Sequence, residues 1–214
     1  MGKFITAQEK FWAGKFGDEY ILRNNDVKTV HANTNLFCKI FSCTNNIKSI
    51  IELGANIGLN LLAIKNLLSN VELSAVEINK KAVIELGKID NVTIYNQSIL
   101  ELVPDYQRDF VFTKGVLIHI DPDMLSKAYD LLYKLSRKYI CITEYYNPTP
   151  ISVEYRGQKN KLFKRDFAGE ILDRFDDLSL ISYGFAYHRD NNYYYDDLNW
   201  FLLGKDDVTK DIQN

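Results

Sequence analysis

The 214-residue sequence is short of the residues that build cross-linked or metal-stabilised folds. It has only three cysteines, Cys38, Cys43 and Cys141, and no two of them have C-x-x-C spacing. An odd number without that spacing argues against a disulfide framework and a structural zinc site. No metal is therefore expected, and a reducing cytoplasm is the expected location. The four prolines and eleven glycines form no linker, which predicts one domain with elaborations.

Long apolar runs and an excess of basic charge are also missing. No run of about 18 apolar residues occurs, and the first residues, MGKFITAQEK, have no apolar signal core, so neither a membrane span nor secretion is expected. The 26 basic and 28 acidic residues leave a net charge of −2, which argues against binding nucleic acid through its phosphates. Chemistry on small molecules fits this composition better.

From Ser49 onward, short β-branched runs alternate with helical patterns, as is typical of a parallel sheet with helices on both faces. We expect the strands of this sheet at 48–53, 71–77, 92–96, 109–114 and 138–145. Helices are expected at 57–68, 80–88 and 122–135. A helix near 166–175 and strands at about 178–187 and 198–204 follow, and the loop 188–197 predicts that these last two strands are antiparallel.

The stretch SIIELGANIGLN, residues 49–60, predicts a nucleotide-binding turn. An apolar strand that ends near Glu52 turns through Gly54 and Gly58 into a helix, whose first N–H groups point at the turn. Glu77 ends the next apolar strand, 19 residues after Gly58 (77 − 58), where a carboxylate can accept hydrogen bonds from the hydroxyl pair of a ribose. Carboxylates at two strand ends indicate a site for an adenosine-type ligand.

The residues that this turn lacks narrow the choice of ligand. A dinucleotide-binding turn that began at Gly54 would have glycine where Asn56 and Leu59 stand, and no lysine follows Gly58 as in a phosphate-binding loop. Glu52 would repel a phosphate and suits a ligand with a positive charge or an amino group. S-adenosylmethionine has both, so it is the expected cofactor.

The turn resembles the first motif of the class I methyltransferases, acidic-x-Gly-x-Gly-x-Gly, with Asn56 in place of the middle glycine. The resemblance implies an α/β fold with a Rossmann-like seven-stranded sheet, whose last strand is inserted antiparallel. It also implies that Ser98 meets the adenine amino group and that Ile99 packs on the ring. The residues expected to bind the cofactor are Tyr20, Asn24, Glu52, Gly54, Ala55, Asn56, Gly58, Glu77, Ile78, Ser98, Ile99, Lys114, Gly115 and Leu117.

Methyl transfer from a sulfonium is an in-line displacement that depends mainly on positioning. In the segment DFVFTKGVLIHIDPDML, His119 follows a strand end and is the best candidate for a base that takes a proton from the methyl acceptor. The same histidine could instead support the pocket or the core.

Two further segments are expected to flank the site. Residues 1–45 are rich in aromatic side chains and predict a helical lid, or alternatively a cover of the core. The segment of about 145–165 predicts a basic acceptor loop, in which arginines suit a carboxylate or phosphate, or alternatively a solvated loop. The domain itself is expected over 46–206, with a tail at 207–214. The expected substrate-binding residues are Trp12, Arg23, Tyr145, Arg156 and Arg165.

The segments FWAGKFGDEYILRN, IIELGANIGLN, FTKGVLIHI and EYRGQKNKLFKRDFAGE together resemble the methylases associated with pseudaminic acid biosynthesis. The resemblance implies a bacterial enzyme that methylates a nucleotide-linked sugar or another anionic precursor of a capsule or flagellar glycan. Two alternatives stay open, a methylase of a surface or flagellar protein and a non-catalytic regulator that binds S-adenosylmethionine. The sequence predicts no particular oligomeric state.

Overall fold

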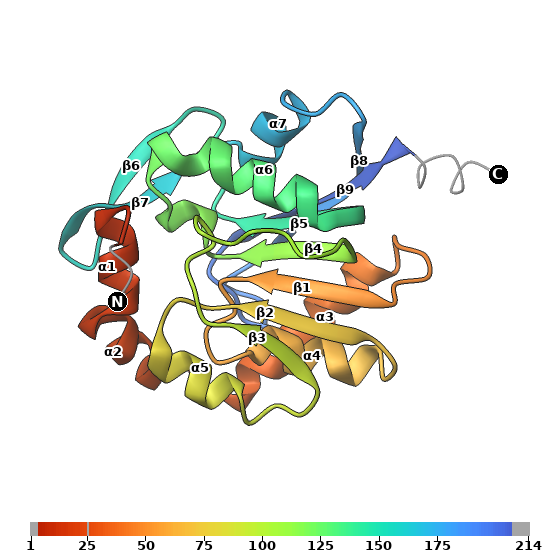
Figure 1. Cartoon of the computed structure of the whole chain (residues 1–214), viewed down its shortest axis with the longest axis horizontal. Coiled ribbons are helices and arrows are strands. Elements are labelled where there is room, and N and C mark those ends of the chain that lie inside the picture. The colour runs from red at the N-terminus through yellow and green to blue at the C-terminus, as the bar shows by residue number, and fades with distance from the viewer. Residues whose placement is uncertain (1–3, 25, 207–214) are drawn as a thin grey trace.

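The computed structural model describes residues 4–24 and 26–206, so the expected tail lies outside the described residues. Seven strands form one sheet in the order β3-β2-β1-β4-β5-β9-β8 (Figure 1). Strands β1 to β5 are parallel, and β9 is inserted antiparallel between β5 and β8. The strands are β1 (Ser49–Leu53), β2 (Glu72–Val76), β3 (Val92–Tyr95), β4 (Arg108–Lys114), β5 (Ser136–Glu144), β8 (Leu178–Ala186) and β9 (Leu198–Lys205). This is the predicted Rossmann-like seven-stranded sheet.

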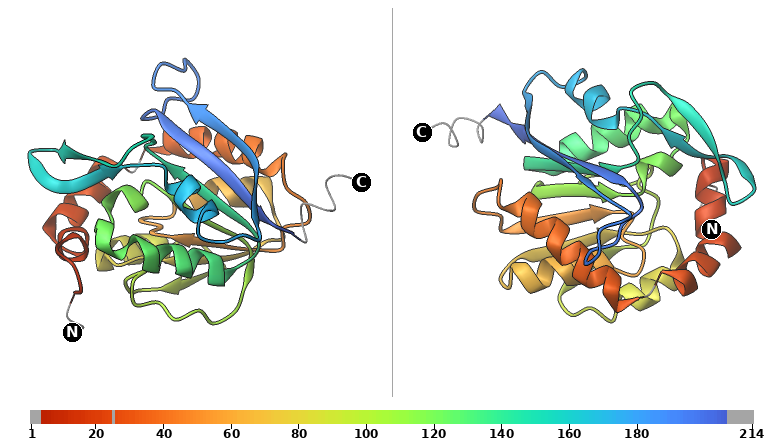
Figure 2. Two further views of the ribbon diagram at one scale, coloured as in Figure 1. Left: turned by 90° about the horizontal axis from the view of Figure 1, so that it is seen from above. Right: turned by 180° about the vertical axis from the view of Figure 1, so that it is seen from behind.

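Helices cover both faces of the sheet (Figure 2). Phe110 and Phe112 of β4 pack in one cluster with α3 and α4, whereas Val111 faces the other cluster with α6 and α7. This alternation follows from the period of two in a strand, and burial on both faces explains why the central strands are continuously apolar. The helices are α3 (Val27–Phe41), α4 (Leu59–Leu67), α5 (Lys80–Leu86), α6 (Leu125–Leu135) and α7 (Phe167–Leu172).

Two predicted helices begin later than the sequence pattern suggests. The helix expected from residue 57 begins at Leu59, because Gly58 has a left-handed backbone with φ of 82°. The helix expected from Pro122 starts as a short 3₁₀ turn, η2 (Pro122–Met124), and becomes α-helical at Leu125. No helix in the described part of the chain is long and apolar enough to cross a membrane.

The N-terminal segment divides into two parts with different surroundings. Helices α1 (Ala7–Ala13) and α2 (Lys15–Arg23) lie beyond the carboxyl ends of the strands, next to α5 and a β-hairpin (Figure 1). Helix α3 instead packs against α4, and its Leu36, Phe37 and Ile40 are buried in the core. Only α1 and α2 are thus placed where a lid would be, and their opening and closing stay a prediction.

The segment after β5, which the sequence analysis treats as a loop, contains a β-hairpin. Its strands are β6 (Ile151–Tyr155) and β7 (Gln158–Lys164). Arg156 and Gly157 form the two-residue turn with φ of 49° and 76°, the positive values that a type I′ turn requires. The sequence does not predict this turn, because two-residue hairpin turns usually contain Asn-Gly or Asp-Gly and this one contains Arg-Gly.

Replacement of Phe37 by alanine tests whether α3 belongs to the core. The Phe37 side chain has no exposed surface, and its ring centroid lies 5.2 Å from that of Phe112. We expect Phe37→Ala to lower the free energy of unfolding by about 3–5 kcal/mol, measured by denaturant titration. Leu22→Ala is the control, because Leu22 is 75% exposed, and should change it by less than about 0.5 kcal/mol. Equal effects of the two substitutions would contradict the core assignment of α3.

Candidate functional site

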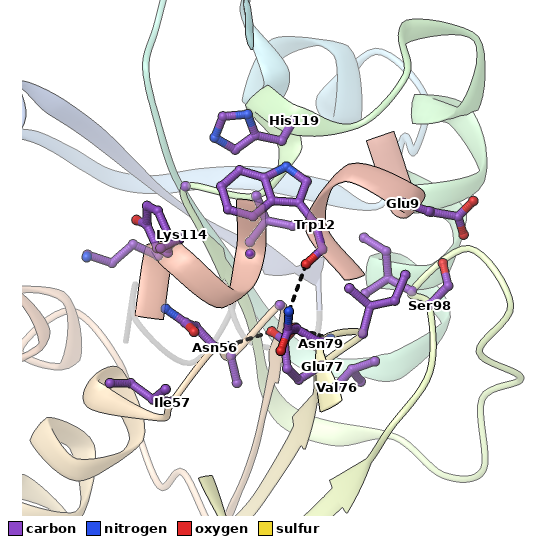
Figure 3. Close-up of a pocket in the computed structure, with 18 of the residues that line it drawn as sticks. Glu9, Trp12, Asn56, Ile57, Val76, Glu77, Asn79, Ser98, Lys114 and His119 are labelled. Carbon is purple, nitrogen blue, oxygen red and sulfur yellow. Dashed lines mark hydrogen bonds between the residues drawn. The ribbon is translucent and has the colours of Figure 1, made fainter. Parts of the chain in front are cut away.

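A pocket lies at the carboxyl ends of β1, β2, β3 and β4, and α1 and α2 form its opposite wall (Figure 3). The loops after the four strands contribute Gly54, Glu77, Ser98 and Gly115, respectively. Open α/β sheets bind ligands at this edge, where strand order reverses and helix N-termini converge. Between them, the four loops and the two helices make this pocket the candidate site.

The turn after β1 keeps its shape because three of its residues have left-handed backbones. Gly54, Asn56 and Gly58 have φ of 79°, 49° and 82°. A Cβ on Gly54 would lie 2.6 Å from a methyl group of Val116, so the position requires glycine. Asparagine tolerates left-handed φ better than most residues. This tolerance explains how Asn56 can stand where the resembling motif has glycine.

Glu77 fastens that turn to the end of β2. The residue is 8% exposed, and its Oε2 accepts a hydrogen bond from the N–H of Asn56 at 2.7 Å. Oε1 accepts another from the N–H of Asn79 at 2.6 Å. Burial raises the pKa of Glu77, and these backbone hydrogen bonds oppose the rise. The predicted ribose-binding carboxylate is therefore already held in place by backbone N–H groups.

Asn79 connects the sheet edge to the helices across the pocket. Its Oδ1 caps α5 by accepting from the N–H groups of Lys81 and Ala82. Its Nδ2 donates to the carbonyl oxygen of Trp12 at 3.1 Å and to Oδ1 of Asp18 at 2.9 Å (Figure 3). An asparagine directly before a helical pattern is a usual N-cap, whereas the contacts with α1 and α2 depend on the tertiary fold.

Glu52 and Lys114 bring buried ionisable groups to the end of the pocket near β1. Glu52 is fully buried, burial raises its pKa to about 8, and its Oε1 accepts from Nδ2 of Asn60 at 2.5 Å. The carboxyl group is thus mostly protonated at neutral pH and does not line the pocket itself, whereas Asn60 does. Lys114 also lines it, and burial lowers the pKa of its ammonium group.

His119 lies in the short helix η1 (Leu117–His119) and faces Trp12. Their ring centroids are 4.6 Å apart, and the ring centroid of Tyr155 lies 5.0 Å from that of the histidine. Nδ1 is 2.6 Å from the carbonyl oxygen of Lys161, which can only accept, so Nδ1 has the proton and Nε2 has the lone pair. Burial lowers the pKa to about 4, so the ring is neutral at physiological pH.

Glu144, at the end of β5, holds the segment that contains His119. Its Oε1 accepts from the N–H groups of Val116 and Leu117 at 2.9 and 3.0 Å. Burial raises its pKa to about 7. Glu144 is not among the predicted site residues, although a carboxyl residue at the end of a buried strand is a signal that the sequence contains.

The pocket brings together most of the predicted residues. The predicted residues that line it are Trp12, Tyr20, Asn24, Gly54, Ala55, Asn56, Glu77, Ile78, Ser98, Ile99, Lys114, Gly115 and His119. The lining residues without a predicted ligand role are Thr6, Gln8, Glu9, Gly17, Thr29, Ile57, Leu59, Asn60, Val76, Asn79, Gln97, Val116 and Ile120. Most of the second set come from α1 or flank predicted residues in the sequence.

Seven predicted residues do not line the pocket, among them Glu52, described above. Leu117 is buried in the core, and Gly58 packs against the side chains of Leu86 and Ile89. Arg165 forms an ion pair with Glu170 at 2.5 Å, and Arg156 is exposed at the hairpin turn. The remaining two are Arg23, whose guanidinium lies over the ring of Phe16, and Tyr145, which packs on the core. Their roles in acceptor binding stay predictions.

No group of three or more histidine, cysteine, aspartate or glutamate residues that could hold a metal ion occurs among residues 4–24 and 26–206.

No family model matches this sequence, and no curated protein sequence matches it. Many solved structures share the fold. The 1,6-didemethyltoxoflavin-N1-methyltransferase of Burkholderia thailandensis, with S-adenosylhomocysteine bound, has a TM-score of 0.69 and 12% identity over 96% of this chain and 93% of that chain. The plantazolicin methyltransferase in complex with S-adenosylhomocysteine has a TM-score of 0.64 and 14% identity, over 93% and 94%. The magnesium protoporphyrin IX methyltransferase from Synechocystis PCC 6803, with S-adenosylmethionine bound, has a TM-score of 0.62 and 12% identity, over 95% of this chain and 100% of that chain.

Asn79→Asp tests the connection between the sheet edge and the helices across the pocket. Aspartate keeps the oxygen that caps α5 but loses the donor to Trp12 and repels Asp18. We expect faster amide hydrogen exchange in α1 and α2, by about tenfold, with unchanged exchange in β1 and β4. The control is Asp26→Asn at the N-cap of α3, the reverse substitution between asparagine and aspartate at another helix start. Equal protection of α1 and α2 in the variant and the wild type would disprove the connection.

The protonation of His119 can be followed by NMR. Its imidazole signals should shift only as the pH approaches about 4, rather than near the ordinary value of 6.5. The unfolded chain binds this proton at higher pH than the folded protein, so His119 should lower the stability as the pH falls from about 6.5 to about 4. His119→Asn should remove that part of the pH dependence. A midpoint near 6.5 would show that the ring is accessible to water.

Proposed function

We propose that this protein transfers a methyl group from S-adenosylmethionine to a small-molecule acceptor. The observation that carries the proposal is the buried Glu77 carboxylate, which holds the Gly54–Gly58 turn at the pocket floor and has oxygen lone pairs left for the two hydroxyls of a ribose. Structures with the same fold that contain S-adenosylmethionine or S-adenosylhomocysteine support this cofactor.

The lining residues fit each part of such a cofactor. Glu77 would accept from the ribose, and Ile78 and Ile99 would enclose the base between apolar side chains. The partly buried ammonium group of Lys114 suits the carboxylate of the methionyl part, and the unpaired amide oxygen of Asn60 suits the amino group of that part. When bound, the cofactor supplies an electrophilic methyl group on a positively charged sulfur.

The other residues of the pocket position the acceptor and handle its proton. Trp12 and Tyr20, from α1 and α2, close the pocket against water. A hydroxyl or amine of the acceptor must lose a proton as its bond to the methyl carbon forms, and Nε2 of His119, which has the lone pair, would take it. The hydrogen bond from Nδ1 to Lys161 keeps that tautomer.

For the acceptor we infer a nucleotide-linked sugar or a phosphorylated precursor of a bacterial surface glycan, as the family resemblance implies. The basic hairpin supports an anionic part outside the pocket, because Arg156, Lys159 and Lys161 lie on β6–β7 beside α1, and Nζ of Lys161 lies 5.2 Å from the ring centroid of Phe11. Arg165 is already paired with Glu170 and contributes less to this charge. The fold itself does not select the acceptor, since the similar structures are named for acceptors as different as a toxoflavin precursor and magnesium protoporphyrin IX.

Two measurements test the proposed function. Calorimetry should show saturable binding of S-adenosylhomocysteine, and methyl-labelled S-adenosylmethionine should label a low-mass, anionic compound in an extract of cells that lack the gene. Label in a protein fraction would favour the protein methylase. Binding without any transfer, in extracts that support turnover by another methyltransferase, would favour the non-catalytic regulator.

Glu77→Gln tests the ribose carboxylate. One position of the amide becomes a donor, so it can no longer accept at both oxygens, and affinity for S-adenosylhomocysteine should fall at least about tenfold because a charge-assisted hydrogen bond is lost. Glu85→Gln is the control, since this glutamate is partly exposed on α5, pairs with Lys88 and does not line the pocket. Unchanged affinity in a folded Glu77→Gln variant would remove this residue from the site.

A further inference from the structure

We propose that Glu9, in α1, binds the 6-amino group of the cofactor's adenine, so that the N-terminal helix completes the base-binding site. The inference rests on the proposed function and names a residue that the sequence does not connect with the cofactor.

One carboxylate oxygen of Glu9 is buried and unpaired. Eight buried side-chain nitrogen and oxygen atoms in the described part of the chain have no hydrogen-bond partner, and four of them belong to residues that line the pocket. These four are Gln8 Oε1, Glu9 Oε1, Trp12 Nε1 and Asn60 Oδ1. Buried polar atoms are rarely left unpaired, so their concentration at one pocket indicates ligand groups that pair with them.

The Glu9 carboxylate is also held in one orientation. Its Oε2 accepts from the N–H of Thr6 at 2.6 Å, and Thr6 Oγ1 accepts from the N–H of Glu9 at 3.1 Å, which together form a capping box at the start of α1. Glu9 is only 6% exposed. The capping box uses one oxygen and leaves Oε1 for a ligand.

The place of Glu9 along the pocket also supports the inference. The proposed function assigns Glu77, after β2, to the ribose. The adenine base, which is attached to the ribose, then lies at the end of β3, because β3 is the strand next to β2 on the side away from β1. Figure 3 shows Glu9 on the same side of the pocket as Ser98, which follows β3, and away from Lys114 and Asn56. Oγ of Ser98 already accepts from the N–H of Leu100 at 3.0 Å. An amino group at this end donates two hydrogen bonds, and Oε1 of Glu9 is a buried oxygen on this side that has no partner among the described residues.

The test compares S-adenosylhomocysteine with S-inosylhomocysteine, in which a carbonyl oxygen replaces the 6-amino group. Calorimetry with the wild-type protein should show tighter binding of the adenosyl compound. In Glu9→Gln, the N–H of Thr6 keeps the amide oxygen at the cap, so the amide NH₂ faces the pocket. The ratio of the two affinities should then fall at least about tenfold, in favour of the inosyl compound. Glutamine also suits a capping box, so the helix keeps its start.

Glu19→Gln is the matched control, because it makes the same substitution in α2 at a glutamate that pairs with Lys15 at 3.7 Å and does not line the pocket. Its affinity ratio should equal that of the wild type. An unchanged ratio in Glu9→Gln, or an equal loss for both compounds, would overturn the assignment while leaving the proposed function in place. If neither compound binds the wild-type protein, the proposed function fails and this inference fails with it.

Discussion

The pocket depends on one buried carboxylate that accepts backbone hydrogen bonds from two separate loops. Glu77 holds the left-handed turn after β1 through Asn56 and the start of α5 through Asn79. Asn79 in turn donates to the main chain of Trp12 and to Asp18, so the same chain of contacts reaches α1 and α2. Without the Glu77 carboxylate, the turn, α5 and the opposite wall of the pocket would lose their common attachment.

The same arrangement recurs on the other half of the sheet edge. Glu144 ends β5 and accepts from the N–H groups that follow β4, just as Glu77 follows β2 and holds the loop that follows β1. In both of these pairs of parallel strands, β1 with β2 and β4 with β5, a carboxyl group at the end of one strand orders the loop after the other. Burial raises the pKa of both groups, and backbone donors offset part of that cost. The Gly54–Gly58 turn and the segment with His119 are thus fixed to the sheet by equivalent contacts.

The sheet and the floor of the pocket could be predicted because their signals are local. Apolar runs mark β1 and β2, and Gly54 and Glu77 stand where those runs end. The hairpin was missed because its Arg-Gly turn resembles no common turn pair. The ion pair of Arg165 with Glu170 could not be predicted either, because a sequence shows charges without their partners. Glu9 went unnoticed for a similar reason, since its approach to the pocket depends on how α1 packs.

The hydrogen bonds of Asn79 also bear on the kinetics of the protein. If a ligand leaves by separation of α1 and α2 from α5, that movement breaks the contacts of Asn79 with Trp12 and Asp18 and the ion pair between Asp18 and Lys81. In the proposed enzyme, the rate of that separation would set an upper limit on the number of catalytic cycles per second, whatever the speed of the bond-forming step. Side chains far from the reacting atoms would then determine how long the product stays bound.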